Sequence, residues 1–262
     1  MQITDVHIGG GWMSLKKDTM AMNAVAAMIK AEEPDLVIAT GDVSYPVPFQ
    51  AGTFNNLSSA RIFAELMESL GVYWTLGFGN HDTEAYSYYG REDLSELYGD
   101  EKYSYCIFEA GPEDVDGYGN QVFNIVKSNG IITRSLFTLD THSYVDGDIF
   151  GILWKYDNIH ENQIEWYRET IEKNKNHNRM KLFASSDSEF GKKNPTAGNI
   201  PSSVFLHVPL MEYKDAYEEY VNAGYKDTAN VIYKYGVAGE SGQVVYPGLH
   251  ADNFFETMQE LY

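Results

Sequence analysis

The stretch Leu36-Val-Ile-Ala-Thr-Gly-Asp42-Val-Ser-Tyr45 decides the fold, because it runs from an apolar strand pattern directly into a polar turn. Residues 36–40 are apolar or β-branched throughout, which is typical of a strand buried on both faces. Residues 72–76 have a similar composition and also end at a glycine, Gly77. The sequence therefore predicts two buried strands, each followed by a glycine-containing turn.

Helical patterns lie before and between these strands. Residues 16–31 and 58–70 carry apolar side chains at helical spacing, and Gly71 is a natural helix stop. Two further strand-like runs, 121–126 and 131–139, flank a tight-turn sequence and predict a hairpin. Downstream we expect a strand at 203–206, a long loop at 185–201, and helices at 161–175, 211–222 and 251–261. This order of elements predicts an α/β fold with a mixed sheet, in a single domain spanning 1–262.

The composition argues against several classes of protein. The chain has 262 residues, and 38 acidic against 19 basic side chains give a net charge of −19, which repels nucleic-acid phosphates. No apolar run is long enough to predict a membrane span. The single cysteine, Cys106, excludes an internal disulfide and a thiolate metal cluster. We expect a cytoplasmic protein; an exported form remains open if an N-terminal signal was removed.

Polar side chains follow four of the predicted strands, at the point where each strand ends. Because ligands of open α/β sheets bind beyond the carboxyl ends of the strands, we expect these side chains to share one pocket. Carboxylate, imidazole and amide donors without thiolate suit Mn, Fe or Zn. A carboxylate with two oxygens can also bridge two ions about 3.5–4 Å apart, the spacing that clamps a phosphoryl group. The side chains concerned are Asp5, His7, Asp42, Asn80, His81, Asp82 and His207.

Three motifs carry a specific resemblance. Asp5-x-His7, Gly41-Asp42-x-x-Tyr45 and Gly79-Asn-His-Asp82 occur in an order and spacing that resemble the calcineurin-like metallophosphoesterase superfamily. The segment Phe205-Leu-His-Val-Pro-Leu-Met-Glu-Tyr213 resembles the branch related to purple acid phosphatases. The resemblance implies a four-layer α/β/β/α sandwich of two mixed β-sheets, with a dinuclear metal site at one edge.

The resemblance also implies a role for each site residue. Asp5 and His7 would bind the first metal ion, Asn80 and His207 the second, and Asp42 would bridge the two ions.

The catalytic roles follow in the same way. His81 would contact the substrate phosphate and protonate the leaving oxygen, and Asp82 would orient His81 by a hydrogen bond. Water activated between the two ions would attack the ester. Tyr45 either reaches the substrate or braces its loop, and His142 is expected to make a structural hydrogen bond rather than to line the pocket.

One expected motif is missing. Relatives complete the metal site with Gly-His-x-His, which supplies one histidine to each ion, and no such string occurs in these 262 residues. The nearest similar segment, Gly248-Leu-His250-Ala-Asp252, directly precedes a predicted helix. The predicted first strand also has only four residues before Asp5. We therefore expect the domain to be incomplete at both ends.

Two function classes stay open on the sequence. A metal-dependent phosphoesterase acting on a phosphorylated small molecule or a phosphoprotein is favoured by the presence of His81, which metal binding alone does not require. A catalytically weak or inactive relative, serving as a binding or scaffold module, is favoured by the missing histidine pair. The sequence does not indicate an oligomeric state, and it does not distinguish monoesters from diesters.

Overall fold

Two three-stranded sheets form the centre of the molecule. The computed structural model describes residues 1–145, 147–148, 152–153, 155–184, 198–236 and 244–262. The first sheet is parallel in the order β1-β2-β3, and the second, in the order β4-β5-β6, pairs β4 antiparallel and β6 parallel to β5. The strands are β1 (Gln2–Ile3), β2 (Leu36–Thr40), β3 (Tyr73–Gly77), β4 (Gln121–Val126), β5 (Ile132–Thr138) and β6 (Ser202–Phe205).

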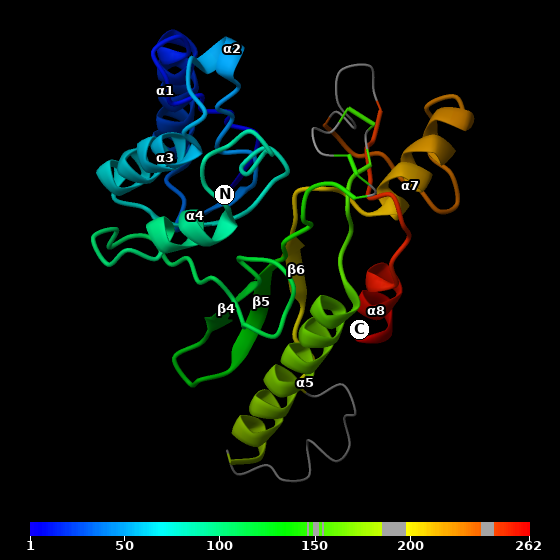
Figure 1. Ribbon diagram of the computed structural model, residues 1–262. Helices are drawn as coiled ribbons and strands as arrows, with labels where there is room; N and C mark the ends of the chain where they lie inside the picture. Colours follow the sequence, from blue (N-terminus) through cyan, green and yellow to red (C-terminus); the bar gives the residue numbers. More distant parts are fainter. Residues whose placement is uncertain (146, 149–151, 154, 185–197, 237–243) are drawn as a thin grey trace.

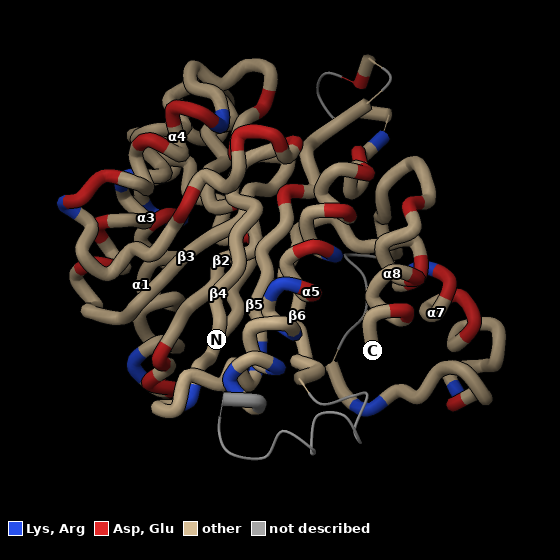
Figure 2. The backbone as a smooth tube through the Cα atoms, turned by 90° about the horizontal axis from the view of Figure 1, so that it is seen from below, with Lys and Arg blue, Asp and Glu red and all other residues tan. Residues whose placement is uncertain are grey.

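Helices form the two outer layers. Seen from below, α1 and α3 lie outside the first sheet, and α5 and α8 lie outside the second (Figures 1 and 2). This arrangement confirms the predicted α/β/β/α sandwich. The helices are α1 (Leu15–Glu32), α2 (Pro48–Ala51), α3 (Asn56–Leu70), α4 (Arg91–Tyr98), α5 (Glu161–Ala184), α7 (Met211–Asn222) and α8 (Phe254–Glu260).

Each sheet has its own hydrophobic core against its own helices. In the first core, Trp74 of β3 is fully buried and meets the ring of Phe63 from α3 edge-on, at 5.6 Å between ring centroids. In the second core, Phe137 of β5 packs against Tyr167 of α5, which also contacts Phe254 of α8. Apolar burial on the outer faces therefore leaves the edge of the sandwich free for polar side chains.

The two sheets are joined by a buried amide, the side chain of Gln121 in β4. Its Oε1 accepts a hydrogen bond from Thr75 Oγ1 of β3 at 2.9 Å, and its Nε2 donates to the Leu76 carbonyl at 3.0 Å. The same Nε2 also lies 3.1 Å from Thr138 Oγ1 in β5. Because these groups are buried, this one side chain satisfies polar atoms of both sheets.

The predicted elements agree with the structure except in length and in two short helices. The helix predicted at 161–175 extends to Ala184 as α5. In this extension, the side-chain amide of Asn178 pairs with both backbone groups of Ile132 in β5 and so attaches the helix to the sheet. Helices α2 and α4 are too short to give a periodic signal. Of the loop predicted at 185–201, residues 185–197 lie outside the described part of the chain.

Within the described residues, no helix combines the length and the apolar character needed to cross a membrane. Acidic positions are spread over helices and loops on the face shown in Figure 2.

Replacement of the joining amide tests how the sheets are held together. Gln121→Ala should lower the free energy of unfolding by about 2–5 kcal/mol, because each buried polar group left without a partner costs about 1–3 kcal/mol. Denaturant unfolding followed by circular dichroism measures the change. The control is Gln259→Ala on the exposed side of α8, where we expect a change within about 0.5 kcal/mol. Equal, small losses in both variants would contradict the bridging role.

Candidate metal centre

The five predicted metal ligands come together beyond the carboxyl ends of β1, β2, β3 and β6. Asp42 Oδ2 lies 3.4 Å from His7 Nε2 and 3.4 Å from His207 Nε2. His7 Nε2 is also 3.4 Å from Asp5 Oδ1, and His207 Nε2 is 3.1 Å from Asn80 Oδ1. Residues separated by up to about 200 positions in the chain thus form two adjoining donor groups that share Asp42.

The backbone at these strand ends is strained. Asp5, His7 and Asp42 have φ values of 55°, 51° and 52°, in the left-handed region that non-glycine residues rarely adopt. Such conformations cost about 1–3 kcal/mol each and persist where the surrounding structure holds them. Here the loops hold one another, because the Asp5 amide donates to the Gly41 carbonyl and the His7 amide donates to the Asp42 carbonyl.

Glycine is required at the two turns that flank Asp42. A Cβ at Gly41, whose φ is 91°, would lie 2.5 Å from the backbone nitrogen of Gly79. A Cβ at Gly79 would lie 2.2 Å from Asp42 Oδ1. The turns after β2 and β3 therefore approach each other more closely than any side chain allows.

The Asp42 carboxylate is buried, with 3% of its side chain exposed, and its two oxygens have different partners. Oδ1 accepts a hydrogen bond from the His81 amide at 2.8 Å, and Oδ2 faces the imidazoles. Burial opposes ionisation of Asp42, but the charge and hydrogen bond of His207 outweigh it and hold the pKa well below its usual range. Oδ2 is therefore an ionised donor available to cations.

Hydrogen bonding also fixes the tautomer of His207. Its Nδ1 donates to the Thr40 carbonyl at 2.8 Å, so the lone pair of Nε2 points toward Asp42 and Asn80. This arrangement, in which one ring nitrogen is anchored and the other is free, is usual for metal-binding histidines. Burial lowers the pKa of His207, yet the charge of Asp42 outweighs this and raises it to about 9. Protons and metal ions would therefore compete for the same lone pair.

His7 is the second imidazole whose environment fits a cation. Its Nε2 is buried without a hydrogen-bond partner, although carboxylate oxygens of Asp5 and Asp42 lie nearby. Burial opposes protonation of His7, but the negative charge of these two neighbouring carboxylates outweighs it and raises the pKa of His7 to about 9. The site is thus negative enough to attract positive charge.

The geometry and chemistry of the donors fit two metal ions. Donor atoms about 2.0–2.2 Å from one ion lie about 3–3.5 Å apart, and the distances here are 3.1–3.4 Å. One group offers Asp5, His7 and Asp42, and the other offers Asp42, Asn80 and His207. An oxygen and imidazole donor set without thiolate suits Mn, Fe or Zn.

The structure corrects the role predicted for Asp82. Its Oδ2 accepts hydrogen bonds from the amides of Asp42 (2.9 Å) and Gly79 (2.8 Å), and its Oδ1 accepts from the Ser44 amide (2.8 Å). Burial and the charge of Asp42 raise the pKa of Asp82 to about 6. Asp82 therefore holds the turns after β2 and β3 together, because both of its oxygens accept hydrogen bonds from backbone amides of these turns. It does not orient the His81 ring.

Glu84 makes the contact that was predicted for Asp82. Its buried Oε1 lies 2.6 Å from His81 Nδ1 and accepts a hydrogen bond from the Tyr144 hydroxyl at 2.9 Å. That hydroxyl in turn accepts a hydrogen bond from Asn80 Nδ2 at 2.7 Å. A chain of hydrogen bonds therefore orients both His81 and Asn80. No motif spacing indicates Glu84, and Tyr144 lies 60 positions farther along the chain, so sequence reasoning missed both.

An ion pair joins the start of α4 to the loop that follows β5 in the second sheet. Arg91, at the start of α4, donates to both oxygens of Asp140, which follows β5, and both contacts are 2.8 Å. The same guanidinium donates to the Gly79 carbonyl and to Ser143 Oγ. Arg91 thus fixes the turn after β3 relative to the loop that carries Tyr144. A lone arginine in a charged helix gives no signal of this role in the sequence.

The remaining sequence expectations concern three side chains. The ring of Tyr45 lies against both His7 and His81, with centroid distances of 4.7 and 4.5 Å, so it is at the site while its role stays a prediction. His142 makes a hydrogen bond with Gln163, as expected. His250 lies beside the loop that contains Asp157, because the preceding Leu249 amide donates to the Tyr156 carbonyl.

The support role of Asp82 leads to a stability prediction. Asp82→Ala should lower the free energy of unfolding by more than about 3 kcal/mol, because it leaves three backbone donors unsatisfied at about 1–3 kcal/mol each. Denaturant unfolding measures the loss. Asp35→Ala, at an exposed position, is the matched control and should change stability by about 0.5 kcal/mol or less. A stable Asp82→Ala protein would show that the turns do not depend on this carboxylate.

Comparison with known proteins gives consistent matches. Two Arabidopsis thaliana proteins, named probable inactive purple acid phosphatase 28 and 29, are each 22% identical to the chain, over 243 and 230 residues. The matches cover 82% and 81% of this chain but 54% of each relative, so the chain spans about half the length of these proteins.

Among solved structures, a dimetal phosphatase from Danio rerio matches with a TM-score of 0.44 at 10% identity, covering 80% of this chain and 69% of the other. The decisive match is to a family, the calcineurin-like phosphoesterases, and it extends over residues 1–237. This range includes every strand of the sandwich and every predicted metal ligand. The chain therefore belongs to the calcineurin-like phosphoesterase family.

Proposed function

We propose that this chain is the catalytic part of a metal-dependent phosphoesterase, which hydrolyses a phosphate ester with two ions held between the four strand ends. The observation that supports this most strongly is the position of Asp42 Oδ2, 3.4 Å from both His7 and His207. When bound there, two ions would lower the pKa of a water molecule from about 15.7 toward about 7 and stabilise charge on the phosphoryl oxygens.

His81 is the proposed general acid. Its Nδ1 is held by Glu84, so the opposite nitrogen, Nε2, faces the site and lies 3.9 Å from Asp42 Oδ2. With Glu84 accepting the Nδ1 proton, Nε2 is the atom that exchanges a proton with the leaving oxygen. About a quarter of the side chain is exposed, which gives the substrate access to this nitrogen.

The proposed substrates are phosphorylated small molecules or phosphoproteins. A net charge of −19 disfavours the extended phosphate backbone of a nucleic acid, whereas a single phosphoryl group needs positive charge at only one point. Bound cations would supply that charge locally.

A second candidate function is binding without catalysis. Its support is the lack of a Gly-His-x-His string in these 262 residues and the word inactive in the names of both Arabidopsis relatives. Without that string, each proposed ion has three protein donors, one of them shared. The two candidates differ in whether metal binding and turnover occur together.

Metal analysis separates them. After dialysis, the metal content of the 262-residue chain should exceed that of an Asp42→Asn variant by fewer than two ions per chain. The same chain should show little activity on a nitrophenyl phosphoester. Removal of a residue that only hydrogen-bonds to a metal ligand costs about 10- to 100-fold in affinity or activity. The lack of a residue that binds the metal directly should therefore cost more. A longer chain that adds a downstream Gly-His-x-His should hold close to two ions more than its own Asp42→Asn variant, and it should turn over substrate. Two ions without turnover in that chain would favour the binding function.

The leaving-group dependence tests His81. In the active longer chain, His81→Ala should leave the metal content nearly unchanged and should slow hydrolysis of an alkyl phosphoester far more than that of a nitrophenyl ester. The reason is that only the poor leaving group requires a proton, and general acid catalysis contributes about 10²- to 10⁴-fold. Steady-state rates on both esters give the comparison. Equal slowing of the two esters would argue against the general-acid role.

A further inference from the structure

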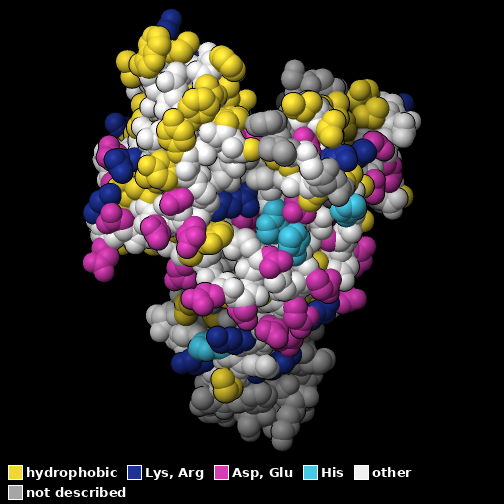
Figure 3. Space-filling model, in the orientation of Figure 1, with side chains coloured by type: hydrophobic (Ala, Val, Ile, Leu, Met, Phe, Trp, Pro, Cys, Tyr) yellow, Lys and Arg dark blue, Asp and Glu magenta, His cyan; other side chains and the backbone are white. Residues whose placement is uncertain are grey.

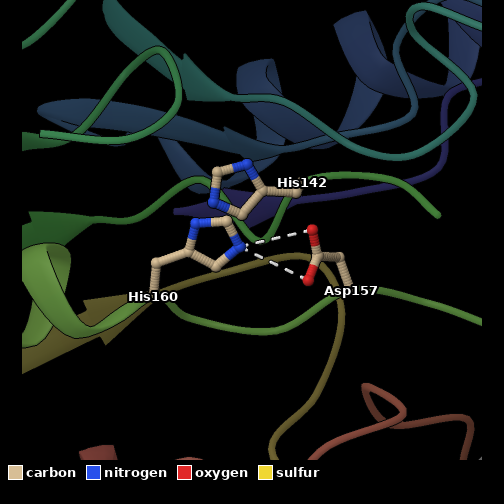
Figure 4. A group of neighbouring side chains, drawn as sticks. All are labelled: His142, Asp157 and His160. Atoms are coloured by element: carbon tan, nitrogen blue, oxygen red, sulfur yellow. Dashed lines mark hydrogen bonds and ion pairs between the residues drawn. The ribbon is translucent and has the colours of Figure 1, made fainter. Parts of the chain in front are cut away.

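A second group of metal-binding side chains lies outside the candidate metal centre. It consists of His142, in the loop after β5, and Asp157 and His160, just before α5 (Figure 4). One donor atom from each residue lies within 4.8 Å of the other two, and all three side chains are half-buried. The group shares no residue with the candidate metal centre. Figure 3 shows histidine side chains beside acidic ones near the middle of one face of the molecule.

Each ring nitrogen of His160 lies beside a carboxylate, one from inside the three-residue group and one from outside it. Its Nδ1 lies 2.8 Å from Asp116 Oδ2, and its Nε2 points at both oxygens of Asp157, at 3.3 and 3.4 Å (Figure 4). A carboxylate behind one nitrogen commonly orients a histidine whose other nitrogen binds metal. Asp116 thus stands where such an orienting group is expected.

The tautomer of His142 follows from the bonds of Gln163. The Gln163 Nε2 donates to Asn120 Oδ1 and to the Asp140 carbonyl, so its Oε1 is the acceptor. This Oε1 lies 3.1 Å from His142 Nε2, which must therefore carry the proton. Burial lowers the pKa of His142 and favours the neutral ring, despite the charge of Asp140. Its Nδ1 then holds a free lone pair.

We propose that His142, Asp157 and His160 bind one divalent transition-metal ion, Zn²⁺ by preference, at a site separate from the candidate metal centre. Two imidazole nitrogens and one carboxylate oxygen, with water as the fourth ligand, are a common donor set for tetrahedral zinc.

Binding requires a small rearrangement. Donor atoms around a tetrahedral zinc ion lie about 3.4 Å apart, so atoms now within 4.8 Å must move inward by about 1 Å. The two imidazoles are stacked at 4.0 Å and 18°, and one ring must turn so that both lone pairs meet. An open cleft lined by His160, Glu161 and Asp252 borders the group at His160.

The bound ion would act as a clamp. It would connect the loop after β5, in which Tyr144 contacts Asn80, to the segment that begins α5. The loop that contains Tyr144 helps to orient Asn80, a proposed ligand of the candidate metal centre. The bound ion would hold the same loop at His142. The site therefore has a structural role that does not require turnover.

Zinc content tests the proposal directly. The chain is stripped of metal with a chelator and titrated with Zn²⁺, and bound metal is counted by mass spectrometry after gel filtration. The double variant H142Q/H160Q should bind one ion per chain fewer than the parent, and Asp157→Asn should weaken that ion by at least about 10-fold. The control His177→Gln replaces a histidine of α5 that contacts the Gly130 carbonyl and should bind as many ions as the parent. Equal zinc content in parent and double variant would overturn the proposal.

A measurement on the unaltered chain guards against misfolded variants. In nitrogen NMR spectra, Zn²⁺ should shift His142 Nδ1 and His160 Nε2, while the partner nitrogens stay protonated. Co²⁺ in place of zinc should add the visible absorption of a tetrahedral site, and this absorption should be missing in H142Q/H160Q. Ring signals of both residues that do not move at saturating Zn²⁺ would show that the pair is held by hydrogen bonds alone.

Discussion

A buried negative charge, the Asp42 carboxylate, is the constraint around which the rest of the structure is arranged. A carboxylate with 3% of its side chain exposed is stable only where hydrogen bonds and opposite charges compensate it. One oxygen is satisfied by the His81 amide, and the other faces His7 and His207. The left-handed backbone at Asp42 brings the carboxylate to this position, and the glycines beside it allow the turns to meet. Strain and buried charge therefore occur together at the site where cations are proposed to bind.

Polar contacts between the two sheets hold this arrangement in place. Gln121 joins β3, β4 and β5 within the sandwich, and Arg91 with Asp140 joins their ends near the site. Glu84 and Tyr144 then link His81 to Asn80, which come from the same turn but serve different proposed roles. Buried polar groups strengthen one another only when all of them are satisfied, and the residues of this network come from both sheets. The residues that form and support the candidate metal centre thus come from both sheets.

At both proposed metal sites, carboxylates lie beside histidine side chains, as the acidic composition of the chain favours. A chain with 38 acidic and 19 basic residues repels phosphate unless positive charge is supplied locally. At the candidate metal centre, carboxylates raise the pKa of His7 and of His207 to about 9, against the effect of burial, which shows how strongly this site attracts protons or other cations. The group around His160 uses the same chemistry at a different loop, with Asp116 and Asp157 on its two ring nitrogens.

The sequence by itself determined the α/β class, the strands and the main helices, because an uninterrupted apolar run such as 36–40 and apolar residues at helical spacing such as those in 58–70 are local patterns. It also identified Asp5, Asp42 and His207 as neighbours, because polar residues at strand ends meet at one edge of a sheet. Only the tertiary structure decided which carboxylate orients His81. Asp82 and Glu84 are similar acids two positions apart, and the choice depends on where the amides of Gly79 and Ser44 converge. Contacts such as Arg91 with Asp140 depend on the packing of two sheets, which no local pattern encodes.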